Sequence, residues 1–113
     1  MIIHGVELDF HLYDKDKADV KERYFDALEK MKGVKGEMPE GTEQEQNKYL
    51  CDRIKGLFDT VFGEGTGIAV CGTDNDLLAH LEAYDQLASE QIRQQNQYAA
   101  IMKRMKDMRK AVK

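Results

Sequence analysis

Apolar and polar side chains alternate along residues 6–13, with the apolar ones at the even positions. This period of two predicts a strand with one buried face. An isoleucine pair at positions 2 and 3 precedes His4 and Gly5, a dipeptide whose glycine tolerates the positive φ of a tight turn. The pattern predicts a short hairpin with residues 1–3 as its first arm. Because two strands alone are marginal in water, the hairpin must lie on helices or extend another sheet.

Two segments with apolar residues at helical spacing follow. The first runs from about Asp16 to Lys32, with apolar residues at positions 20, 24, 25, 28 and 31. The second begins at a predicted capping box formed by Thr42 and Glu45 and ends at Gly63. Gly56 lowers helix propensity inside this segment, so we expect another helix to approach closely there.

The third helical pattern is much longer than the other two. No proline or glycine follows Gly72, so we expect one helix from about residue 74 to residue 112, measuring about 58 Å at 1.5 Å per residue. A compact domain of this size has a radius of gyration of only about 13–14 Å. The helix must therefore break or protrude. We expect protrusion, with the helix leaving the body or bending in the glutamine-rich stretch 91–97.

The expected fold is α+β, mainly α: an N-terminal β-hairpin, two amphipathic helices and a long C-terminal helix. We expect a compact domain at residues 1–92 and a protruding basic helical extension at residues 93–113. The glycines at 63, 65 and 67 predict a structural corner, with positive φ at Gly65 or Gly67. The expected corner and core residues are Tyr24, Leu28, Phe58, Phe62, Gly63, Gly65, Gly67, Leu81 and Tyr84.

Length and composition are those expected of a small globular protein without a membrane span. With 113 residues, 42% of them hydrophobic, the chain supports one small domain, and no apolar run approaches the roughly 18 residues of a membrane span. The first residues lack a basic region followed by an apolar run, so we expect no signal peptide and a cytoplasmic location. Cys51 and Cys71 form no CxxC motif and are expected to be reduced and partly buried, although a disulfide between them stays open.

No segment of the sequence predicts catalysis or a cofactor. The glycines at 63, 65 and 67 are not followed by the Lys-Ser or Lys-Thr of a phosphate-binding loop. Asp14, Asp16 and Asp19 resemble the start of a calcium loop, but Asp19 occupies its glycine position. Asp76 and His80 are expected to form a surface pair one helical turn apart rather than a metal site. We therefore expect no enzyme, no cofactor and no metal.

Charge is distributed unevenly along the chain. The net charge is −4, yet residues 103–113 carry six basic side chains against Asp107 alone, which leaves an acidic body and a basic tail. Such a distribution suits a protein partner or head-to-tail self-association. Met102, Met105 and Met108 have two interpretations: a structural one, as ordinary packing or a frayed terminal helix, and a functional one, as an adaptable partner surface. The candidate protein-interaction residues are Tyr98, Met102, Lys103, Arg104, Met105, Lys106, Arg109 and Lys110.

The corner sequence CDRIKGLFDTVFGEGTG (residues 51–67) resembles small tail assembly chaperones of tailed bacteriophages and prophages. Residues 3–8, 24–28, 75–78 and 83–85 are similar to further motifs of that group, whereas the basic helical end departs from its usual polar end. The resemblance implies a non-enzymatic protein that coats the long helical tape-measure protein, keeps it soluble and recruits major tail subunits. The alternative from another class is a small coiled-coil regulator whose basic end contacts DNA or RNA.

Overall fold

The computed structural model describes the backbone of residues 1–112 and the side chains of residues 1–109. It is mainly helical, as predicted, with a short N-terminal hairpin and a long C-terminal helix. The elements in chain order are β1 (Ile2–Ile3), β2 (Val6–Glu7), the 3-10 helix η1 (Lys15–Lys17), α1 (Ala18–Met31), α2 (Val34–Glu37), α3 (Glu43–Phe62), α4 (Thr66–Cys71) and α5 (Leu77–Val112).

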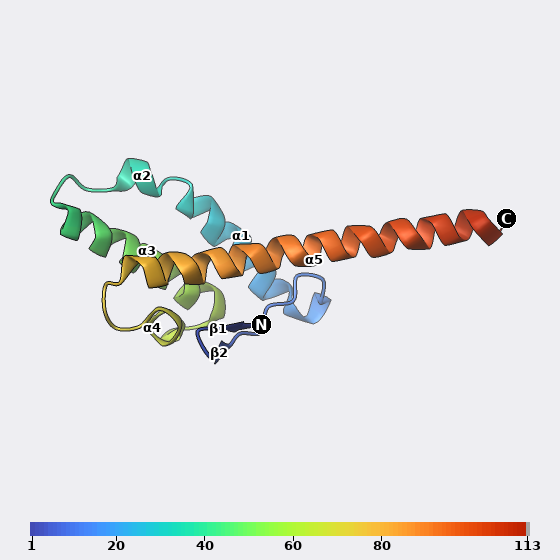
Figure 1. Cartoon of the computed structure of the whole chain (residues 1–113), viewed down its shortest axis with the longest axis horizontal. Coiled ribbons are helices and arrows are strands. Elements are labelled where there is room, and N and C mark those ends of the chain that lie inside the picture. Colours follow the sequence, from blue (N-terminus) through green and yellow to red (C-terminus); the bar gives the residue numbers. More distant parts are fainter. Residues whose placement is uncertain (113) are drawn as a thin grey trace.

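Helix α5 is continuous and sets the shape of the molecule. It runs past the other elements, and its C-terminal half extends beyond them (Figure 1). The described chain measures 65 × 28 × 23 Å, and its radius of gyration is 17.4 Å, well above that of a compact domain of this length. Protrusion of an unbroken helix, rather than a break, is confirmed.

The hairpin is shorter than the alternating pattern predicted. His4 and Gly5 both have positive φ (48° and 81°), as a two-residue hairpin turn requires, and Ile3 pairs with Val6. Beyond Glu7 no strand continues, so the predicted strand through residue 12 is wrong there. The alternation of burial is nevertheless present, because Leu8, Phe10 and Leu12 are all buried.

The core lies where α1, α3, α5 and the N-terminal segment meet. Tyr24 and Phe58 are fully buried, and the Tyr24 ring packs edge-on against Phe10 at a centroid distance of 4.9 Å. Leu28, Phe62 and Tyr84 are partly buried against this cluster. Leu81, also predicted to be core, is 44% exposed. That prediction is wrong because α5 turns a different face inward, the one that carries His80, Ala83 and Leu87.

The glycine-rich corner is structural in detail. Gly63 and Gly65 have φ of 118° and 93°, and between them the chain turns from α3 into α4, a short helix that the sequence did not predict. The Asp59 carboxylate caps α4 by accepting a 2.7 Å hydrogen bond from the Gly67 amide. A Cβ at Gly67 would lie 2.8 Å from Lys55 Cα and would also overlap the Lys55 carbonyl oxygen. Close helix packing therefore occurs at Gly67.

Two other predictions about single positions need correction. A Cβ at Gly56 would meet nothing within 4 Å, so no helix approaches Gly56 closely. His80 is fully buried rather than part of a surface pair. Its Nδ1 lies 2.6 Å from the Asp76 carbonyl oxygen, while its Nε2 has no hydrogen-bond partner among the described residues.

Candidate protein-interaction surface

One face of α5 carries a long seven-residue pattern. Its positions are 80, 84, 87, 91, 94, 98, 101, 105 and 108, separated alternately by four and three residues. This spacing keeps side chains on one face of a helix. The first part of the face packs on the body, where His80 and Leu87 are buried. The last part continues past the body without a covering element (Figure 1).

The exposed end of this face is the candidate interaction surface, and we call Tyr98, Ile101, Met102, Met105 and Met108 the distal stripe. Tyr98 is 47% exposed, and beyond it the exposed fraction rises from 39% at Ile101 to 56% at Met105 and 67% at Met108. Met102 is 46% exposed. None of the three methionines is packed in the core.

The helix leaves the body one turn later than the sequence suggested. Gln94 lies inside the glutamine-rich stretch, yet its Nε2 donates to the Phe10 carbonyl (2.7 Å) and its Oε1 accepts from the Leu12 amide (2.8 Å). Tyr98 then stacks on Tyr13 at a centroid distance of 4.2 Å. The body contacts of α5 thus continue to Tyr98, which serves the fold as well as the exposed stripe.

Gln94 is held in place by its neighbours on α5. The Glu90 carboxylate accepts hydrogen bonds from Arg93 Nε and Nη2, both at 2.7 Å, and from Gln94 Nε2 at 2.9 Å. These bonds, first of all those from Arg93, lower the pKa of Glu90 to about 2. The carboxylate therefore stays charged at neutral pH and fixes the amide that joins α5 to the N-terminal segment.

A hollow lies at the step where the body ends and α5 continues. Its volume is about 680 Å³, and its lining includes Phe10, Tyr13, Gln94, Tyr98 and Ile101. Its lining also includes the charged side chains of Asp14, Glu90 and Arg93. A helix or extended segment laid along the stripe would have its end at this hollow.

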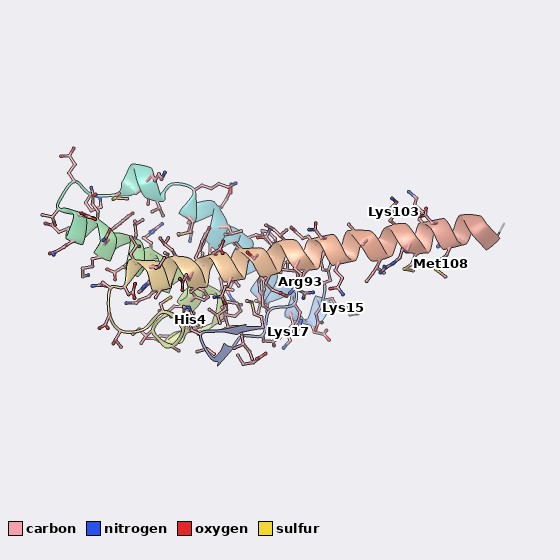
Figure 2. All side chains as sticks on the ribbon, viewed as in Figure 1. His4, Lys15, Lys17, Arg93, Lys103 and Met108 are labelled. Carbon is pink, nitrogen blue, oxygen red and sulfur yellow. The ribbon has the colours of Figure 1, made fainter. Side chains whose placement is uncertain are left out.

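Exposed basic side chains lie on the same part of α5 as the distal stripe. Lys103, Arg104, Lys106 and Arg109 are all exposed, and no carboxylate among the described side chains forms an ion pair with them. Figure 2 shows Lys103 and Met108 on the part of α5 that extends beyond the body. The side chain of Lys110, the remaining predicted interaction residue, lies outside the described ones.

The corner residues do not form part of this surface. Phe58 is buried, Phe62 packs on the core, and Gly63, Gly65 and Gly67 shape the turn between α3 and α4. Both thiols are free and buried, which is deeper than predicted, and burial raises the pKa of Cys71 to about 11. A thiol with so high a pKa is a poor nucleophile at neutral pH.

Sequence reasoning missed Gln94 and the exposure of Leu78, Leu81 and Ile92. No local signal distinguishes Gln94 from its neighbouring glutamines. The exposed leucines could have been suspected, because the apolar residues of α5 occupy more of its circumference than one buried face needs.

The described residues contain neither a metal-binding cluster nor a candidate membrane span. No group of three His, Cys, Asp or Glu side chains among them is placed to hold a metal ion. Within the same residues, no helix combines the length and apolar character needed to cross a membrane.

A protein-family model, described as a family of unknown function (DUF6673), matches residues 4–113. The chain belongs to this family. The match to DUF6673 includes both the compact body and the distal part of α5. No curated protein and no solved structure matches the chain.

Proposed function

We propose that this DUF6673 protein is a non-enzymatic assembly factor that binds a partner protein through the distal stripe of α5. The observation that carries the proposal is the exposed apolar stripe itself, because a helix that holds Ile101, Met105 and Met108 in water without a partner exposes surface that association would bury. Exposed apolar residues at helical spacing suit a helix-on-helix contact.

The partner we propose is the tape-measure protein of a tailed bacteriophage, bound in the host cytoplasm, with the major tail protein recruited afterwards. The resemblance of residues 51–67 to tail assembly chaperones supports this choice. A tape-measure protein is long and helical, so a chaperone must bind many different helical segments. Methionine suits this task because its flexible side chain repacks against varied surfaces.

The direct test is co-expression with a tape-measure protein carrying an affinity tag. Changing Ile101, Met105 and Met108 together to Gln should reduce co-purification about ten-fold or more, because the apolar surface is lost while the charges remain. Ile2→Gln is the matched control, since Ile2 is a 64% exposed apolar residue on the hairpin. Equal co-purification of the triple variant and the wild type would contradict the proposal.

The alternative is a small regulator whose basic end contacts DNA or RNA. It is favoured by the same exposed residues Lys103, Arg104, Lys106 and Arg109. Phosphate contacts would give binding that weakens steeply with salt. Titration of the protein with duplex DNA and with RNA at several salt concentrations separates the two functions. Salt-sensitive binding that survives the triple Gln variant would favour the regulator.

A genomic observation tests the proposed pathway independently of any binding measurement. The resemblance implies a gene directly before a very long gene for a tape-measure protein. A gene that consistently lies elsewhere, among regulators, would count against tail assembly.

A further inference from the structure

Charge is segregated along α5 and the loop that leads into it. Residues 73–92 contain five acidic side chains and no lysine or arginine, whereas residues 93–109 contain five basic side chains and Asp107. The change of sign falls close to the point where the helix leaves the body. The covered half of the element is therefore acidic, and the protruding half is basic.

The acidic half has an exposed apolar stripe of its own. Leu78 is 65% exposed, Leu81 44% and Ile92 55%, and we call these three residues the proximal stripe. At about 100° per residue, the proximal stripe lies on roughly the opposite side of α5 from the buried residues His80, Ala83 and Leu87. A helix from a second molecule can therefore lie along the proximal stripe without contacting the body of the chain that carries this stripe.

The two stripes are complementary in charge, and the distal stripe is short enough to lie along the proximal one. The distal stripe spans residues 98–108, about 15 Å of helix, and the proximal stripe spans residues 78–92, about 21 Å. Asp85 lies within the proximal stripe, and the basic residues Lys106 and Arg109 border the distal one. Pairing two distal stripes would instead place basic side chains against basic side chains, which costs free energy.

We propose that a second copy of this chain covers these stripes, with the distal stripe of one copy packed on the proximal stripe of another. The apolar side chains supply the contact, and the opposite charges select the pairing of basic half with acidic half. The contact joins two different surfaces of the same chain, so each added copy can offer a further site. This inference goes beyond the proposed function. Self-association and partner binding both use the distal stripe, but only self-association uses the proximal stripe.

A charge-swap experiment tests the pairing. The distal variant carries Lys106→Glu and Arg109→Glu, and the proximal variant carries Asp85→Lys and Ser89→Lys. Glu82 is left unchanged because its carboxylate lies 3.8 Å from His4 Nε2. All four positions are exposed, so both variants should keep the helical content and the melting temperature of the wild type.

Sedimentation velocity at low salt then measures association. The wild type should show an average mass that rises with concentration above its 13.0 kDa. Each variant alone should associate about ten-fold or more weakly, since like charges now meet at the contact. An equal mixture of the two variants should associate again, because each mixed contact pairs acid with base.

Three outcomes would overturn the proposal: a wild type that stays at 13.0 kDa at every concentration, variants that associate as the wild type does, or a mixture that stays dissociated. The proximal variant also separates this inference from the proposed function. It leaves the distal stripe intact, so it should still co-purify with a tape-measure protein while losing self-association. Failure of co-purification by the wild type would count against the proposed function alone.

Discussion

Gly67 and Gly56 are both helical glycines, yet they stand in opposite surroundings. Gly67 lies against the backbone of Lys55, where a Cβ has no room, whereas Gly56 has open space where its Cβ would be. The flexible glycine backbone is a cost at both positions. Only at Gly67 does the fold gain close packing in return.

Substituting each glycine by alanine should therefore give opposite results. Gly67→Ala should lower the free energy of unfolding by about 1–3 kcal/mol, because α4 must move away from α3. Gly56→Ala should raise it by about 0.5–1 kcal/mol, as expected for a glycine in a helix interior. Urea unfolding followed by circular dichroism measures both. A Gly67→Ala protein as stable as the wild type would show that α4 does not pack as described.

Tyr24 is the residue whose burial should affect the pH dependence of stability most directly. Its hydroxyl donates a 2.6 Å hydrogen bond to Gln91 Oε1, and burial raises its pKa from 10.0 to about 12. Between these values the unfolded chain releases the phenol proton and the folded chain keeps it. The contribution of the protonated Tyr24 phenol to the free energy of unfolding is therefore complete below pH 10 and is lost as the pH rises toward 12.

The expected loss from Tyr24 is about 2–3 kcal/mol, at 1.36 kcal/mol per pKa unit. Urea midpoints measured from pH 9 to 12 should fall with pH, with Cys71 adding to the fall from pH 9 upward because its pKa is also raised. In Tyr24→Phe the fall between pH 10 and 12 should be shallower, although the variant loses about 1 kcal/mol at pH 7 with its hydrogen bond. If the urea midpoint falls with pH equally steeply in the wild type and in Tyr24→Phe, the Tyr24 phenol is exposed to solvent and not buried.

Among the elements, those with strong local signals were predictable and those set by tertiary packing were not. The capping box was predicted from Thr42 and Glu45, and the Glu45 amide does donate to Thr42 Oγ1 at 3.2 Å. The hairpin turn followed from Gly5. The segment after Glu7 has a strand's pattern but no neighbouring strand, and the side chain of Gln94 bonds its backbone instead. No local pattern contains that information.

The rotation of α5 about its axis was the main error at this scale. The helix carries apolar side chains on two sides, so its sequence is compatible with burial of either one. The body selects the face of His80, Ala83 and Leu87. The exposed position of the candidate surface beyond Tyr98 was predictable, because no other part of the chain remained to cover it.

A pair of leucine substitutions tests the rotation of α5. Leu87 is 1% exposed and Leu81 is 44% exposed. Leu87→Ala should cost about 2–5 kcal/mol, the usual cost of removing a buried leucine side chain, whereas Leu81→Ala should cost less than about 1 kcal/mol. Thermal or urea unfolding ranks the two variants. The reverse order would mean that α5 turns the face of Leu81, not that of Leu87, toward the body.

For the molecule as a whole, the boundary between body and protruding helix can be located by truncation. Removing residues 99–113 deletes the distal helix but keeps Gln94 and Tyr98, so stability should change by no more than about 0.5 kcal/mol. Removing residues 94–113 also deletes the Gln94 bonds and the Tyr13–Tyr98 stacking. It should cost about 2–3 kcal/mol, because backbone groups of Phe10 and Leu12 lose their partners.

Comparing the urea midpoints of the two truncated chains and the full chain is sufficient to locate this boundary. Equal stability of the two truncated chains would move the boundary back toward residue 92, where the sequence pattern placed it. A large loss on removing residues 99–113 would instead mean that the distal helix contributes to the body.

The unbroken course of α5 has a consequence for how its free end stays ordered. A helix of fewer than about 12–15 residues is marginal in water because its first turn is costly to form. Here the body has already formed that first turn, and the distal residues only extend it. Their amide protons should exchange with solvent progressively faster toward the C-terminus, since each opening needs only fraying from the end. If an added protein covers the free end, the amide protons of the distal residues should exchange more slowly than in the free chain. Repeating the measurement with each candidate partner therefore identifies the one that covers this end.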